Sequence, residues 1–167
     1  MINNVTVFNI RNYLSNKDDK VLGENDLQDI LSDFSCTRNP DVERFLKEQS
    51  IEFTKKNQSV TYLVFSNDDA ALLGYITLTI KPISINPASL SNTIKRKIAR
   101  VSEQNADNGN YSLAAYLIAQ LGKNDTDGLN KRITGEDLLT LAINKIEKLR
   151  YEIGGMIVFL EAEDNKS

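Results

Sequence analysis

Residues 122–137 have the residue types and spacing that could hold a negatively charged group. Gly122 to Ile133 is a polar stretch rich in glycine, asparagine, aspartate and lysine, which accept turn geometry and leave backbone amides free. Thr134 and Asp137 have the spacing of a capping box, which marks the start of a helix. Because a helix N-terminus carries unpaired N–H groups and a positive dipole end, this loop is a candidate phosphate site.

The segments on either side of the loop must position it. Residues 111–121 are nearly all apolar without alternation, which predicts a strand buried on both faces in the middle of a sheet. Residues 134–153 predict an amphipathic helix that ends at Gly154, and residues 156–160 predict a second strand. The apolar residues at helical spacing are Leu138, Leu139, Ala142, Ile143, Ile146 and Leu149. This order predicts a parallel, right-handed strand–helix–strand unit.

Missing residue types exclude several kinds of chemistry. Neither G-x-x-x-x-G-K-[ST] nor G-x-G-x-x-G after a strand occurs, so ATP-type P-loops and dinucleotide folds fit poorly. The chain has no histidine, which disfavours zinc hydrolysis, Ser-His-Asp chemistry and Cys-His proteolysis, and we predict no metal site. Cys36 is the single cysteine, which fits a reducing compartment.

Length and charge place the chain among single-domain globular proteins. It has 167 residues and a formal charge of -3, so its surface as a whole does not favour nucleic acid or anionic lipid. The N-terminus has no basic or long apolar segment, and no window approaches membrane-spanning length. We expect a cytoplasmic protein with no membrane contact and no DNA partner.

The remainder of the chain predicts two groups of elements. Residues 5–10 predict a first strand, and residues 24–34 predict a helix capped by Asn25. Asn39 and Pro40 start a further helix, whose inward side chains are expected to be Val42, Phe45, Leu46 and Phe53. Residues 60–65 and 71–81 predict an antiparallel hairpin, and residues 91–100 an inserted amphipathic helix.

The candidate phosphate loop resembles that of a known family. Residues 130–135, followed by Glu136-Asp137-Leu138-Leu139, are similar to the pyrophosphate loop of the GNAT acyltransferases, Q/R-x-x-G-x-G/A. Gly135 fits the last position, Asn130 replaces Gln or Arg, and Ile133 replaces the middle glycine. The order of elements matches over nearly the whole chain. The resemblance implies an α/β class with an α+β mixed sheet: one GNAT-like acyl-CoA N-acyltransferase domain, 1–167, with an inserted helical segment at about 84–105.

The resemblance also implies a cosubstrate and an activity. Acetyl-CoA would bind through backbone groups that pair with its pantetheine arm and amides that hold its pyrophosphate. The implied binding residues are Leu121, Gly122, Lys123, Lys131, Arg132, Ile133, Thr134, Gly135, Glu136 and Asn165. The implied reaction is acetylation of a primary amine by direct transfer. Glu161 is a candidate base at the end of the last strand, although an exposed polar residue near the chain end is the simpler interpretation.

Departures from the family leave a second hypothesis open. The sequence stops six residues after Glu161, so we expect the family's C-terminal helix and last strands to be missing, together with the tyrosine that reprotonates the thiolate. The alternative is a non-catalytic interaction protein that keeps the scaffold and binds little or no CoA. In either case the strand at 156–160 would expose an apolar edge, which predicts a homodimer or a partner that covers it. The acceptor stays open among small-molecule, peptide and tRNA-borne amines.

One basic cluster lies on the predicted inserted helix: Lys95, Arg96, Lys97 and Arg100. A solvated helix face is the favoured interpretation, because four charges make a modest phosphate-binding footprint. The alternatives are a site for the CoA 3′-phosphate, an RNA or an acidic partner.

Overall fold

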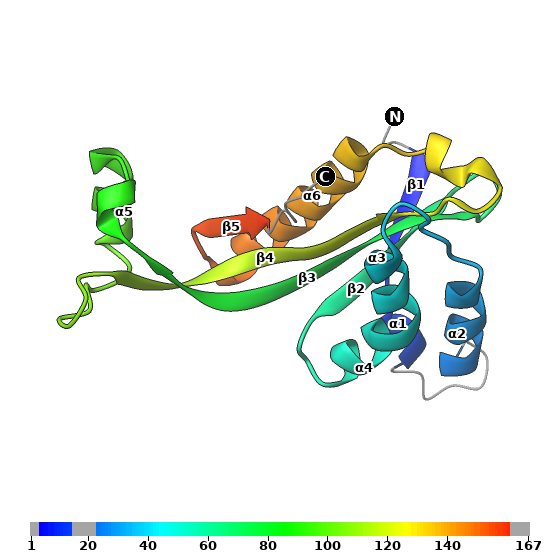
Figure 1. Cartoon of the computed structure of the whole chain (residues 1–167), viewed down its shortest axis with the longest axis horizontal. Helices are drawn as coiled ribbons and strands as arrows, with labels where there is room; N and C mark the ends of the chain where they lie inside the picture. The colour runs from blue at the N-terminus through cyan, green and yellow to red at the C-terminus, as the bar shows by residue number, and fades with distance from the viewer. Residues whose placement is uncertain (1–3, 15–22, 161–167) are drawn as a thin grey trace.

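A computed structural model describes residues 4–14 and 23–160, which form a five-stranded mixed sheet with helices on both faces (Figure 1). The strands are β1 (Val5–Asn9), β2 (Val60–Ser66), β3 (Leu72–Ile85), β4 (Tyr111–Lys123) and β5 (Ile157–Leu160). They are ordered as in the sequence; β1 to β4 are antiparallel neighbours, and β5 is parallel to β4. The predicted hairpin and the predicted parallel unit are both confirmed. Within the described ranges, no helix is long and apolar enough to cross a membrane.

The helices between β1 and β2 cover one face of the sheet. They are α1 (Arg11–Leu14), α2 (Glu24–Ser32), α3 (Pro40–Arg44), the π-helical turn η2 (Phe45–Gln49) and α4 (Ser50–Lys55). The predicted start at Asn39 is confirmed, because its side chain accepts from the Asp41 and Val42 amides. The predicted cap at Asn25 is wrong. Gly23 caps α2, and its N–H donates to the Asp26 carboxylate at 2.7 Å.

The π-helical turn changes which side chains face the core. Val42 and Leu46 are buried as predicted, but Phe53 is 36% exposed rather than inward. A π turn contains one residue more than an α turn, so it rotates the following helix relative to the expected periodicity. Phe53 instead lies edge-on to the half-buried Phe45, with ring centroids 5.6 Å apart.

Helix α6 (Gly135–Ile153) covers the opposite face of the sheet. Its buried residues Leu138, Ala142 and Ile146 pack against a core that includes Ile76 and Ile118. The sheet therefore separates two apolar cores, one under α6 and one under the N-terminal helices.

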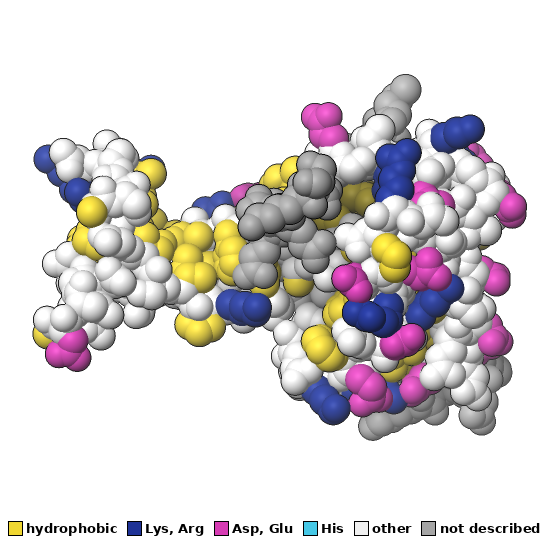
Figure 2. Space-filling model, in the orientation of Figure 1, with side chains coloured by type: hydrophobic (Ala, Val, Ile, Leu, Met, Phe, Trp, Pro, Cys, Tyr) yellow, Lys and Arg dark blue, Asp and Glu magenta, His cyan; other side chains and the backbone are white. Residues whose placement is uncertain are grey.

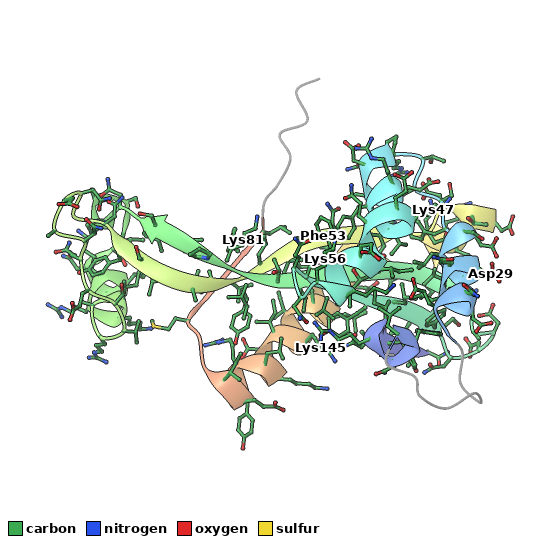
Figure 3. All side chains as sticks on the ribbon, turned by 90° about the horizontal axis from the view of Figure 1, so that it is seen from below. Asp29, Lys47, Phe53, Lys56, Lys81 and Lys145 are labelled. Atoms are coloured by element: carbon green, nitrogen blue, oxygen red, sulfur yellow. The ribbon has the colours of Figure 1, made fainter. Side chains whose placement is uncertain are left out.

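Strands β3 and β4 continue past the body of the protein as a two-stranded arm (Figures 1 and 3). In the arm, Lys81–Ile85 pair with Tyr111–Ala115. The 3₁₀ turn η3 (Pro87–Ser89) and helix α5 (Asn92–Ile98) lie at its tip. The arm explains why the prediction of complete burial for residues 111–121 is wrong: only Ala115–Ile118 are buried in succession, whereas Ser112 and Ala114 are exposed.

Helix α5 is shorter than the predicted helix at 91–100. Ser91 is its N-cap, and the Ser91 side chain accepts from the Ile94 amide. Ile98 is buried, but Ile94 and Val101 from the same predicted apolar stripe are 46% and 58% exposed. The tip of the arm therefore offers α5 little surface to pack against.

Two glycines allow the sheet to pack tightly at the end of β4, where the strand meets the loop. A Cβ at Gly74 would lie 2.5 Å from the Gly122 carbonyl oxygen, and one at Gly122 would meet the Tyr75 ring and Val42 Cγ1, the latter at 2.7 Å. These contacts bring β3, β4 and α3 together at the start of the loop.

We predict that Gly122→Ala lowers the free energy of unfolding by about 1–3 kcal/mol, because the added methyl overpacks this junction. Urea denaturation measures the change. Gly135→Ala is the matched control, since no atom lies within 4 Å of its added Cβ, and it should be neutral or slightly stabilising. Equal stability of the two variants would contradict the packing argument.

Candidate functional site

The side of β4 that faces β5 is paired over only part of its length. Strand β5 pairs with Ala115–Ile118, and among the described residues no strand lies beside Ala119–Lys123 on that side. The backbone of this segment therefore has no strand neighbour on that side, which faces the start of α6, and we call it the open edge of β4.

A bulge interrupts β4 where the β5 pairing stops. Leu78 pairs with Ile118 and Thr77 pairs with Gln120, so Ala119 is an extra residue without an opposite partner on β3. A bulge breaks the hydrogen-bond ladder and redirects backbone groups. Sequence reasoning missed Ala119, because an alanine within an apolar run carries no signal of a bulge.

The register also fixes the direction of the backbone groups beyond the bulge. The Asn124 N–H donates to the Leu73 carbonyl at 2.9 Å, so residues 73 and 124 face each other as a hydrogen-bonded pair. Because such pairs alternate in an antiparallel ladder, Leu121 and Lys123 turn their N–H and C=O groups away from β3, to the open edge. Gly122 turns its groups to β3. Of the three β4 residues that the resemblance implied as backbone partners of the pantetheine arm, two therefore direct their backbone groups to the open edge.

The predicted capping box at the start of α6 is present. The Asp137 amide donates to Thr134 Oγ1 at 3.0 Å, while Asp137 Oδ2 accepts from the Thr134 N–H at 2.9 Å and from its hydroxyl at 2.7 Å. These bonds to Thr134 lower the pKa of Asp137, so the carboxylate is ionised at the positive end of the helix.

The remaining amides around the helix start divide into two groups. The Thr134 N–H is used by Asp137, and the Arg132 N–H donates to the Leu129 carbonyl at 2.9 Å. In the described part of the chain, the N–H groups of Ile133, Gly135 and Glu136 have no hydrogen-bond partner. We call these three amides the α6 cradle.

Two side chains hold the loop in place before the cradle. Ile133, which stands where the GNAT pattern has a glycine, is 4% exposed and packs in the core under α6. The Arg132 guanidinium turns to the β2–β3 connection, where it donates to Asp69 at 2.8 and 3.0 Å and to Ser66 Oγ at 2.8 Å. The Lys131 side chain is exposed, and Lys123 Nζ donates to the Asn130 carbonyl at 2.9 Å.

Two further residues, which sequence reasoning missed, fix the start of the loop. Asn124 is buried; its Oδ1 accepts from the Ser35 amide at 3.0 Å and its Nδ2 donates to the Leu72 carbonyl at 2.9 Å. Asp125 Oδ2 accepts from the Thr37 N–H and hydroxyl, both at 2.8 Å. The Asn-Asp pair after an apolar run was a turn signal, but its distant partners cannot be read from the sequence.

Glu161 and Asn165 lie outside the described residues. Cys36 is buried, and burial raises the pKa of its thiol, which disfavours the thiolate. Across residues 4–14 and 23–160, no group of three or more metal-ligating side chains occurs.

Comparisons with solved structures identify the fold. No protein-family model and no curated protein matches the sequence. AtaT complexed with acetyl-methionyl-tRNAfMet has a TM-score of 0.64 at 17% identity over 97% of this chain and 80% of that one. AtaTR bound with AcCoA has a TM-score of 0.60 at 18% identity, with 98% and 80% covered. The KacTA–DNA complex has a TM-score of 0.55 at 17% identity, with 97% and 77% covered.

The chain therefore has the fold of the GNAT acetyltransferases, as the sequence resemblance implied. One of these structures contains DNA, so the comparisons lend no support to the expectation that DNA is not a partner.

Acid should weaken the contact that holds Arg132. The hydrogen bonds from Arg132 and Ser66 hold the pKa of Asp69 well below its ordinary value. A depressed folded-state pKa stabilises the protein above the unfolded pKa of about 3.9, and this stabilisation is lost as pH falls below it. We predict that wild type melts above Asp69→Asn at pH 7 and that the difference shrinks as pH falls from about 4. A difference that does not change with pH would contradict the role of the ionised carboxylate.

Proposed function

We propose that the protein is an acetyl-CoA-dependent N-acetyltransferase that acetylates a primary amine. The observation that carries the proposal is the alignment of the open β4 edge with the α6 cradle. Both present unpaired backbone groups, and they lie at consecutive points along one path from Ala119 to Glu136. A thioester with a long amide-bearing arm and a diphosphate at its far end has polar groups in the same order.

The residues at the site fit such a ligand. Leu121 and Lys123 can pair with the amides of the pantetheine arm as an additional strand would. The N–H groups of Ile133, Gly135 and Glu136 can donate to diphosphate oxygens at the positive end of α6. Gly135 leaves open space above its Cα, so a ligand can approach its backbone closely.

The chain's own part in the reaction is to hold and polarise. When bound, acetyl-CoA supplies an activated acetyl group. We infer that a backbone N–H at the Ala119 bulge donates to the thioester oxygen, which gains negative charge as the amine attacks the carbonyl carbon. The C–N bond forms, the C–S bond breaks, the nitrogen loses a proton and the thiolate gains one. We assign neither proton transfer to a described side chain.

We infer that the acceptor amine is carried by an aminoacyl-tRNA. Its support is the similar fold of AtaT in complex with acetyl-methionyl-tRNAfMet. Two carboxylates at the start of α6 favour the competing hypothesis of a scaffold without activity. Asp137 already accepts from the Thr134 N–H, and the side chain of Glu136 is exposed beside the cradle amides. A direct measurement of acetyl-CoA binding separates the two hypotheses.

The test removes one N–H donor of the α6 cradle and keeps the helix. Proline has no N–H and is favoured at the first residue of a helix, and the extended Thr134 (φ −96°, ψ 162°) already has the conformation required before proline. We predict that acetyl-CoA raises the melting temperature of wild type and of Gly135→Ala, whereas Gly135→Pro binds about tenfold more weakly through loss of a charge-assisted hydrogen bond.

Calorimetry and transfer of labelled acetyl to methionyl-tRNA complete the assay. Because Gly135→Ala keeps the N–H, it controls for any effect of a larger residue at this position. No melting shift of wild type at millimolar acetyl-CoA would reject the transferase and leave the scaffold hypothesis. A normal affinity in a well-folded Gly135→Pro would remove the Gly135 amide from the site.

A further inference from the structure

We propose that the tip of the β3–β4 arm is a second anion-binding surface, on which Lys95, Arg96, Lys97 and Arg100 contact the phosphate backbone of RNA. This inference rests on the proposed RNA-borne acceptor and adds residues that contact the RNA far from the reacting amine. We call these four residues the tip cluster.

The tip cluster is not neutralised by the protein itself. Helix α5 contains no acidic residue, and among the described residues none of the four side chains makes a hydrogen bond or an ion pair. On the body, by contrast, Arg44, Lys47 and Lys55 each pair with a carboxylate within 2.8 Å. Figure 2 shows lysine and arginine side chains over α5 at the tip.

The position of the arm excludes one earlier alternative. The tip adjoins the start of β4 at Tyr111, whereas the α6 cradle follows the end of β4 at Lys123 (Figure 1). Thirteen residues at about 3.4 Å each separate the two by roughly 40 Å. The tip cluster is thus too far from the cradle to bind the 3′-phosphate of the same CoA.

This separation selects for a long ligand. From Ala119 to Tyr111 the strand extends roughly 27 Å at about 3.4 Å per residue. A small amine or a short peptide at the bulge cannot reach the tip. An RNA that places its terminal aminoacyl group at the bulge can, since its backbone carries charge along its whole length.

The chemistry of the cluster favours phosphate over a protein surface. Arg96 lies on the side of α5 opposite the buried Ile98, with Lys95 and Lys97 on either side of it, and Arg100 follows just after the end of the helix. The face of α5 around Arg96 carries no large apolar or aromatic side chain to act as the anchor that protein interfaces require, because the exposed Ile94 lies on the same side of the helix as Ile98. Exposed cations on a helix face, without such anchors, are suited to sequence-independent phosphate contacts.

The experiment measures salt-dependent binding of fluorescently labelled tRNA to the full chain by anisotropy. The tip variant replaces Lys95, Arg96, Lys97 and Arg100 with glutamine, which keeps helix propensity. The control variant makes the same replacement at Arg44, Lys47, Lys55 and Lys56 on the body, so its net charge is identical. We expect the tip variant to bind about tenfold more weakly at 100 mM salt and to reduce the slope of log K against log salt by about 3.

The control should bind within about twofold of wild type, and acetylation of a small amine should be unchanged in the tip variant. Wild-type affinity in the tip variant, or equal weakening of the control, would overturn the proposal. Displacement of tRNA by polyglutamate, or tighter binding of duplex DNA than of tRNA, at equal charge concentration would overturn the proposal in favour of an acidic protein or of DNA. Acetyl-CoA binding is scored separately, so failure of the transferase proposal is distinguishable from failure of the tip cluster.

Discussion

The unequal pairing of the two sides of β4 is the constraint on which the rest of the structure depends. On one side β4 pairs with β3 along its length except at Ala119, and on the other it pairs with β5 over four residues. The paired side fixes the register of Leu121 and Lys123, and the unpaired side leaves their backbone groups available. Because a parallel neighbour requires a crossover, the same arrangement places the N-terminus of α6 beside the open edge. The candidate site is therefore a consequence of strand pairing rather than of a cluster of reactive side chains.

The loop that joins β4 to α6 is held in place by contacts that differ from the glycine-rich family pattern. Ile133 is buried in the core, Arg132 is held by Asp69, and the Asn124 side chain is bonded to the backbone of Ser35 and Leu72. These contacts replace the conformational freedom of glycine with fixed side-chain anchors. The cost is electrostatic, because the ionised Asp137 occupies one of the amides at the helix start. The three amides of the α6 cradle stay free.

The sequence allowed prediction of the elements whose causes are local. The capping box at Thr134 and the Asn39-Pro40 start depend on neighbouring residues, and the structure confirms them. The predicted apolar face of α6 is confirmed except at Ile143, which is 42% exposed. The bulge at Ala119 and the π-helical turn at Phe45–Gln49 each insert one residue into a regular pattern, which tertiary packing decides. The same is true of the Arg132 side chain, whose guanidinium donates to Asp69, sixty-three residues away. The arm was missed because its strands carry the same β-rich composition as strands in a core.

The arm also separates charge within the molecule. Residues 86–110 contain four cations and two acids, whereas the chain as a whole is negative, so the body is more acidic than the total charge indicates. Two-stranded ribbons are marginally stable alone in water, and here the exposed Ile94 and Val101 show that packing at the tip is sparse. Packing at the tip therefore contributes little to the stability of the protein, and the charge of the tip is its more informative property. If the tip cluster binds RNA as we propose, a positive tip on a negative body steers the polyanion to the arm first, before its aminoacyl end makes contact at β4.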